Sequence, residues 1–251
     1  MTQAAQPSDE VAVQPERPSA AIRAHVTSVV SRLQGGYLRP SGSTSEAVRT
    51  LALLRRSLGL AGGADPRMWA LVLEGLPSGL LGPADRSLAD PTRAETAVLT
   101  AMTTYAVHQQ SQSVPMHQPG VGVGDATRSL AVRRARDDAV SGLHQATVER
   151  LHRVALAQSE DLRRHALRSL VTLMRSSSPP VGLDYGRLAS DLYWLQEPKY
   201  GSRVHLAWAR QLHNKTAREA VDSTLTTATT ADQETQNEHL HRHPRHSKRP
   251  A

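Results

Sequence analysis

The side chains best suited to do chemistry in this sequence are arginines that recur along two predicted helices. At about 100° per residue, Arg164, Arg168 and Arg175 fall within one strip of about 40° on the helix 162–175. No acidic residue follows Arg164 or Arg168 at the fourth position. Arg150 and Arg153 share one face of the preceding helix. The positions predicted to face the core lie about 120° or more from the strip and are apolar: Leu162, Ala166, Leu170 and Leu173.

A row of unpaired arginines predicts a surface for phosphate groups, because the guanidinium is a planar fork that matches phosphate oxygens. Between residues 128 and 175 there are ten basic and five acidic side chains, a net charge of +5. Arg49 and Arg56 lie opposite the apolar residues of an earlier predicted helix and extend the candidate surface. A solvated helix face is the alternative interpretation of any such stripe.

The charge balance of the whole chain favours the same partner. The chain has 30 basic and 23 acidic side chains, a formal net charge of +7. Residues 1–20 and 216–251 together hold six basic and eight acidic side chains, so the segment 21–215 holds 24 and 15, a net +9. The excess positive charge therefore belongs to the predicted folded region. Such a surface favours a polyanion, nucleic acid before an anionic membrane.

No group of residues has the spacing of a catalytic, cofactor or metal site. The chain has no cysteine. The glycine run 120–124 lacks the preceding strand and the GK[ST] of a phosphate loop. His108 and His117 have no acidic residue near them in sequence, and Asp137 and Asp138 are spaced for ion pairs on a helix surface. Histidines at 239–246 suit adventitious metal binding by a tail. We therefore predict no enzyme activity, no cofactor and no bound metal.

The elements that must position the arginines are all predicted to be helices. Ser43-x-x-Glu46 and Thr92-x-x-Glu95 are capping boxes ahead of apolar residues at helical spacing. No segment alternates apolar and polar residues as a half-buried strand does. Further helices are predicted at 127–140, 146–157, 162–175, 184–195 and 202–213.

The predicted fold is an all-α, two-lobed helical bundle with disordered ends. Residues 1–20 and the His- and Arg-rich 216–251 have too few apolar side chains to offset the entropy of ordering. An N-terminal lobe at 21–118 and a C-terminal bundle at 119–215 would meet at the glycine run 120–124. No stretch has the length and hydropathy of a membrane span, and residues 1–20 do not read as a signal peptide. We expect a cytoplasmic protein.

Aromatic residues make up 3% of the chain, with no Phe, so we predict no stacking platform for bases. Binding would then be to the sugar-phosphate backbone and indifferent to sequence. The alternative is a stand-alone helical DNA-binding regulator, but no recognition helix of a helix-turn-helix is evident.

Several short motifs in order resemble the CasB family, the small subunit of the type I-E CRISPR surveillance complex Cascade. They cover about residues 45–213. The first part combines Tyr105-x-x-His108-Gln109 with Pro115-Met116-His117 and Gly120, Gly122 and Gly124. The second part consists of Glu149-Arg150, the segment Leu162 through Leu173, then Leu183-Asp184-Tyr185-x-x-Leu188-x-x-Asp191-Leu192-x-Trp194 and Val204-x-x-x-Trp208-x-Arg210.

The resemblance implies an all-helical, non-catalytic subunit that is present as a pair and contacts guide crRNA, target DNA and the displaced DNA strand beside the other Cascade subunits. Base pairing reads the sequence in such a complex, so this subunit would supply charge and shape to stabilise the R-loop. The family's nucleic-acid contacts would fall on Arg55 or Arg56, Arg150, Arg168, and the loop with Lys199 and Arg203. With the helix-angle candidates, the predicted nucleic-acid-binding set is Arg55, Arg56, Arg150, Arg153, Arg164, Arg168, Arg175, Lys199 and Arg203.

Overall fold

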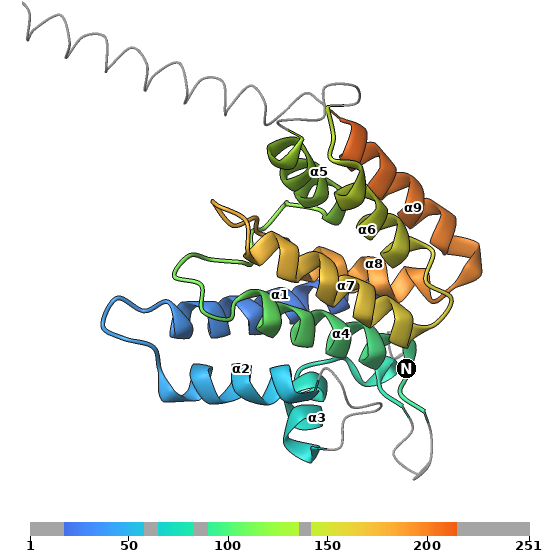
Figure 1. The fold of residues 1–251 in the computed structure, drawn as a ribbon. Helices are drawn as coiled ribbons and strands as arrows, with labels where there is room; N and C mark the ends of the chain where they lie inside the picture. Colours follow the sequence, from blue (N-terminus) through green and yellow to red (C-terminus); the bar gives the residue numbers. More distant parts are fainter. Residues whose placement is uncertain (1–17, 58–64, 83–89, 136–141, 215–251) are drawn as a thin grey trace, which may run out of the picture. The chain divides into compact units, whose positions relative to one another are not determined.

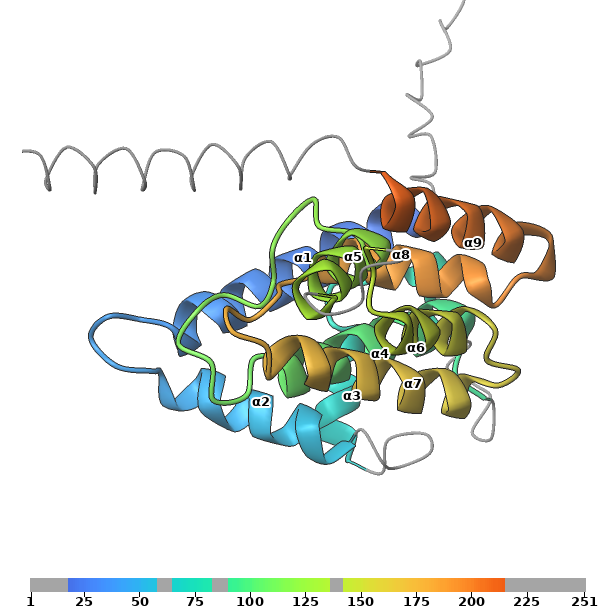
Figure 2. The ribbon, with the colours of Figure 1, turned by 45° about the horizontal axis from the view of Figure 1, so that its top comes forward.

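In a computed structural model that describes residues 18–57, 65–82, 90–135 and 142–214, every regular element is a helix (Figures 1 and 2). This confirms the predicted all-α class. The α-helices are α1 (Pro18–Tyr37), α2 (Ser45–Ser57), α3 (Pro66–Leu73), α4 (Arg93–His108), α5 (Val123–Arg134), α6 (Gln145–Ala155), α7 (Glu160–Arg175), α8 (Tyr185–Leu195) and α9 (Pro198–His213), with a short 3₁₀ turn at Ser78–Leu80. Within these ranges no helix combines the length and hydropathy that a bilayer crossing requires.

Helix α4 is the central element of the bundle. It packs against α1, α2, α3, α7 and α8, so nearly all of its side chains are buried. Its start agrees with the predicted capping box: the Thr92 hydroxyl accepts a hydrogen bond from the Glu95 amide, and the Glu95 carboxylate accepts one from the Thr92 amide. The cap satisfies amides that the first turn would otherwise leave unpaired.

Helices from both sides of the predicted boundary at residue 118 pack together. Helix α1 lies along α8, and α4 contacts both α7 and α8. One continuous hydrophobic core runs from Ile22 in α1 to Leu212 in α9, and the residues up to Leu212 form one compact unit. The hydrophobic core therefore contains residues from both sides of the predicted boundary at residue 118. The division into two lobes stays a prediction.

The glycine run 120–124 starts a helix that is packed closely against α9. Gly122 is the N-cap of α5, and the Gly124 amide donates to Gln211 Oε1 at 2.9 Å. A Cβ at Gly124 would lie 2.3 Å from the Trp208 carbonyl oxygen, so no side chain fits there. Close approach of two helices accounts for the glycine at 124.

Three details of the predicted elements were wrong. Helix α1 begins at Pro18, so the disordered segment predicted for 1–20 cannot include residues 18–20. Helices α1 and α3 were not predicted, although Ile22, Val26, Val29 and Leu33 have helical spacing in α1 and Asp65 caps α3. At α2 the side chain that caps is Thr44, whose hydroxyl accepts from the Ala47 amide at 3.2 Å, whereas Ser43 donates to the Tyr37 carbonyl. Residues 1–17 and 216–251 lie outside the described residues.

Candidate nucleic-acid interface

Helices α6 and α7 pack side by side as a hairpin (Figure 1). A groove runs along the side of this hairpin that faces away from the core. Their inner faces enter the core through Leu151 and Val154 on α6 and Leu167 and Met174 on α7. Two adjoining hollows, of about 570 and 410 Å³, share the lining residue Arg150. The first lies toward the α6–α7 turn, and the second lies toward the C-terminal end of α7.

Arg150, Arg153 and Arg168 line this groove. Arg150 lines both hollows, Arg153 the first and Arg168 the second. The Arg150 guanidinium donates to the Ala146 carbonyl oxygen at 3.0 Å, and Arg153 and Arg168 are exposed. Within the described residues none of these three arginines forms an ion pair. They are available to an anionic ligand, and we refer to them as the groove arginines.

Polar side chains that suit phosphate oxygens accompany the groove arginines. His165 and Ser169 line both hollows, and Thr172 and Ser176 continue the line along α7. The Nδ1 atom of His165 lies 3.0 Å from the Asp161 carbonyl oxygen, which accepts its hydrogen bond. Hydroxyl groups beside guanidinium groups are donors that nucleic-acid backbones meet in proteins.

The predicted apolar face of α7 was wrong by about one residue step. Leu162, which was predicted to face the core, is 58% exposed, whereas Leu167, Val171 and Met174 are buried. The reason is that α7 packs against α4 and α6 through a face that the positions Leu162 and Ala166 only border. Arg164 and Arg175, at about 200° and 220° around the helix from Leu162, consequently lie nearer the core than predicted.

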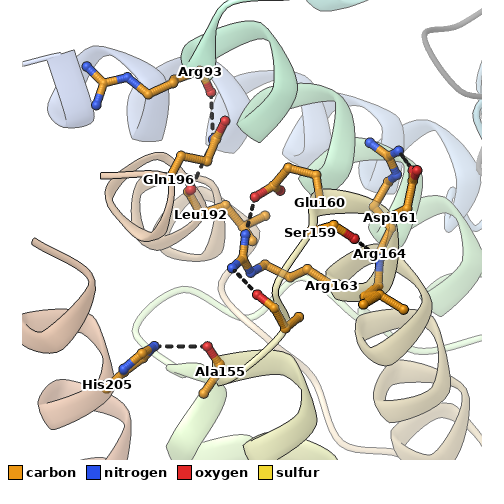
Figure 3. A network of polar contacts seen from close by, with 12 residues as sticks. Arg93, Ala155, Ser159, Glu160, Asp161, Arg163, Arg164, Leu192, Gln196 and His205 are labelled. Atoms are coloured by element: carbon orange, nitrogen blue, oxygen red, sulfur yellow. Dashed lines mark hydrogen bonds and ion pairs between the residues drawn. The ribbon is translucent and has the colours of Figure 1, made fainter. Parts of the chain in front are cut away.

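Arg164 is therefore not a free cation. Its side chain is 18% exposed and forms an ion pair with Asp161, one turn earlier (Figure 3). Arg164 was predicted to be unpaired because no acidic residue follows it at the fourth position. Asp161 instead precedes it by three residues, which also brings the two side chains together on a helix.

Arg175 is also engaged within the molecule. Its guanidinium donates to the Val107 carbonyl oxygen at 3.0 Å and to Gln110 Oε1 at 3.1 Å. These contacts tie the end of α7 to the end of α4, which is a structural role.

Arg163 was not predicted, and its side chain is nearly buried beside the hairpin turn. It forms an ion pair with Glu160 and donates to the Ala157 carbonyl oxygen at 2.9 Å (Figure 3). A glutamate three positions earlier is the signal in the sequence that could have identified the pair. Its burial depends on the packing of the hairpin.

Lys199 and Arg203 lie on α9 and belong to a second cationic surface. The Lys199 ammonium and the Arg203 guanidinium lie 5.6 and 5.3 Å from the centre of the Tyr200 ring. This ring contacts Trp194 edge-on at 4.6 Å between ring centres. Such cation–π geometry orders both side chains without neutralising them. This contact between Tyr200 and Trp194 was not predicted from the sequence.

Arg55 and Arg56 occupy the last turn of α2. Helix α2 packs against α1, α3 and α4, and neither residue lines the groove. Arg55 is half-buried and Arg56 is exposed. The nine predicted residues thus fall into four places: the groove, the inner side of α7, the start of α9 and the end of α2.

His108, His117, Asp184 and Tyr185 form a buried polar cluster between α4 and the segments before α5 and α8. His108 Nδ1 lies 2.7 Å from the Tyr185 hydroxyl, and His117 Nδ1 accepts from the Tyr185 amide at 3.2 Å. Burial lowers the pKa of His108 to about 3 and also lowers the pKa of His117, so both imidazoles are neutral at pH 7. The arrangement agrees with the interpretation of these histidines as structural.

Asp184 completes the cluster by joining three segments. It accepts from the Gly120 amide at 2.9 Å and from the Arg187 amide at 2.9 Å, where it caps α8. Its third partner is the Arg23 guanidinium of α1 at 3.1 Å.

Comparison with known proteins identifies the class. The family model for the CRISPR-associated protein Cse2 matches residues 50–213. The chain belongs to this CRISPR-associated Cse2 family.

Two solved structures are similar. CasB from Thermobifida fusca is 32% identical, with a TM-score of 0.60 over 77% of this chain and 98% of that chain. A CRISPR-associated protein of the Cse2 family from Thermus thermophilus is 22% identical, with a TM-score of 0.50 over 76% and 97% of the two chains, which supports the fold. Among curated protein sequences none matches significantly.

Proposed function

We propose that this chain is the non-catalytic small subunit of a type I-E CRISPR RNA-guided surveillance complex, and that it stabilises the R-loop by binding nucleic-acid backbone. Membership of the Cse2 family supports the assignment to such a complex. The observation that carries the binding role is the groove, where Arg150, Arg153 and Arg168 converge from two helices without acidic partners in the described part of the chain.

The proposed ligands are the guide crRNA and the target and displaced DNA strands. Arginines that contact phosphates hold a strand without reading its bases, which suits a complex in which base pairing supplies specificity. Lys199 and Arg203, with Arg55 and Arg56, provide further backbone contacts. Other Cascade subunits and a second copy of this chain are the proposed protein partners, in the cytoplasm.

The test is charge reversal of the groove arginines in the reconstituted complex. The triple variant Arg150→Glu, Arg153→Glu and Arg168→Glu should lower R-loop formation tenfold or more, since each change replaces a phosphate contact by a repulsion. The matched control is Arg32→Glu, Arg39→Glu and Arg134→Glu, three exposed arginines on α1, the following turn and α5. It makes the same change in net charge and should retain R-loop formation. Equal losses in the two variants would reduce the effect to net charge and contradict the proposal.

Salt dependence gives an independent measure. With about 0.7 counterions released per phosphate contact on a single strand, loss of three contacts should flatten the slope of log K against log salt by about 2. The isolated chain should bind weakly, without sequence preference, and should cleave neither RNA nor DNA. Hydrolysis that copurifies with the chain and is lost on a single substitution would contradict the non-catalytic assignment.

A further inference from the structure

The end of the groove nearest the α6–α7 turn is apolar, unlike the rest. Leu156 is 66% exposed and Leu162 is 58% exposed, the two highest values among the large hydrophobic side chains of the described residues. Both line the hollow of about 570 Å³, where Ala157 and Ala166 extend the apolar surface between them. Exposed leucines that gather in one concave surface, and are not scattered singly, mark an interaction site.

The rim of this apolar end is cationic. Arg150, Arg153, His152 and His165 surround the leucines. Glu149 is the one acidic residue in the lining, and it is already engaged, since it accepts from Gln145 at 2.8 Å and lies 3.8 Å from His152 Nδ1. A ligand that fits both features has an apolar face bordered by negative charge.

The side chains in this hollow favour a protein over unstacked bases. No ring of Phe, Tyr or Trp lines it, and bases of single strands are held chiefly by aromatic stacking. Aliphatic side chains in a channel between two helices instead suit the leucine, isoleucine or valine ridge of a third helix. The second hollow has a different lining, in which Arg168, Thr172 and Ser176 are polar.

We propose that the apolar end of the groove, formed by Leu156, Leu162, Ala157 and Ala166, binds an acidic amphipathic helix of a partner protein. The partner helix places its apolar ridge on the two leucines and its carboxylates beside Arg150, Arg153 and the two histidines. The partner helix shares Arg150 and Arg153 with the proposed nucleic-acid backbone, whereas Arg168 in the second hollow serves the backbone alone. This proposal does not depend on the assignment of the nucleic-acid ligand.

The experiment uses the full chain and two labelled helical peptides of about 18 residues. One peptide carries leucines at helical spacing with Glu on the remaining face, and the other carries Lys in place of Glu. A labelled oligothymidylate of 20 nucleotides is the third probe, and fluorescence anisotropy measures binding. The acidic peptide should bind at least tenfold more tightly than the basic peptide.

The variants separate the two ends of the groove. Leu156→Ser with Leu162→Ser should weaken the acidic peptide at least tenfold and change oligothymidylate binding less than twofold. Arg168→Glu should weaken oligothymidylate and leave the peptide. The matched control, Val48→Ser with Leu206→Ser, removes two exposed apolar side chains elsewhere and should change neither. Thermal melting of each variant verifies that it is folded.

Five outcomes overturn the proposal. Four concern binding: no binding of the acidic peptide at millimolar concentration, equal binding of the basic peptide, peptide binding that survives the leucine double variant, and oligothymidylate binding that is lost with the leucines. The last would assign the apolar end to bases. A change from dimer to monomer by light scattering in the leucine variant would assign it to a second copy of this chain.

Discussion

Polar side chains cluster in two regions, the groove between α6 and α7 and the buried polar cluster. They bond to other protein groups in the cluster, whereas in the groove they face solvent. In the cluster, Asp184 has three protein partners and Tyr185 bonds to His108. In the groove, Arg153 and Arg168 are exposed and unpaired within the described residues. Of the residues that carry the family resemblance, His108, His117, Asp184 and Tyr185 belong to the first region, whereas Arg150 belongs to the second. The comparison teaches that polar side chains with protein partners hold the fold together, while those without such partners are available to a ligand.

The largest expected effect comes from Asp184. Asp184→Ala removes the α8 cap and leaves the Arg23 guanidinium and two amides without their partner. Because the Arg23 side chain is half exposed, the loss of its ion pair adds little, and the lost cap together with the unpaired Gly120 amide costs about 2–4 kcal/mol in the free energy of unfolding. Chemical denaturation should measure a loss of this size.

Asp184→Asn keeps an oxygen for capping and should lose less than Asp184→Ala. A stable Asp184→Ala variant would show that the two regions do not differ in the way described.

The next largest effect is the loss of protein stability in acid that the buried His108 causes. The unfolded chain takes up a proton near pH 6.5, but burial keeps the folded imidazole neutral until about pH 3. The unfolded state therefore binds more protons between these values, and stability falls as pH falls through this window. From pH 8 to pH 5 the loss is about 2 kcal/mol for this residue. Denaturation at both pH values should show that His108→Gln removes the loss.

Asp191 offsets part of this loss. Burial raises its pKa to about 6, although the Trp208 indole, which donates to it at 2.7 Å, opposes the shift. The folded state binds more protons between about pH 6 and the ordinary aspartate value, so stability rises as pH falls there. Asp191→Asn should make acid destabilisation steeper. A profile unchanged in both variants would contradict the electrostatic account of the cluster.

A smaller effect is expected for the Tyr185 hydroxyl. Tyr185→Phe keeps the ring in the core and its edge contact with Tyr105, but leaves His108 Nδ1 without a partner. An unsatisfied buried group costs about 1–3 kcal/mol. The matched change Tyr200→Phe, at the partly exposed ring on α9, should be near neutral in the same measurement.

The smallest effect on stability is expected in the groove. The triple variant at Arg150, Arg153 and Arg168 should change the free energy of unfolding by no more than about 0.5 kcal/mol per site, as surface substitutions usually do. Thermal unfolding should confirm this while R-loop formation is lost. By contrast, Arg163→Ala should destabilise the chain, because Arg163 is buried with Glu160 and the Ala157 carbonyl. If the groove variant is destabilised and Arg163→Ala is not, the groove arginines are structural and Arg163 is not.

The all-α class, the positions of most helices and the charge were determined by the sequence alone. Thr92 and Glu95 are close in the chain, so their cap follows from local geometry. Arg150 and Arg168 were identified by helix angle as well as by resemblance, and both line the groove. Local patterns predict what neighbours within one or two turns determine.

Only the tertiary structure decided which arginines are free. Arg164 pairs with Asp161, which a spacing of four residues does not identify. The contacts of Arg175 depend on α4, 65 or more residues away in sequence. The exposure of Leu162 and the burial of Arg163 follow from the face by which α7 meets α4 and α6. Helical periodicity gives the relative angles of side chains, but the angle at which a helix meets the core is set by its neighbours, and that angle separates a binding arginine from a structural one.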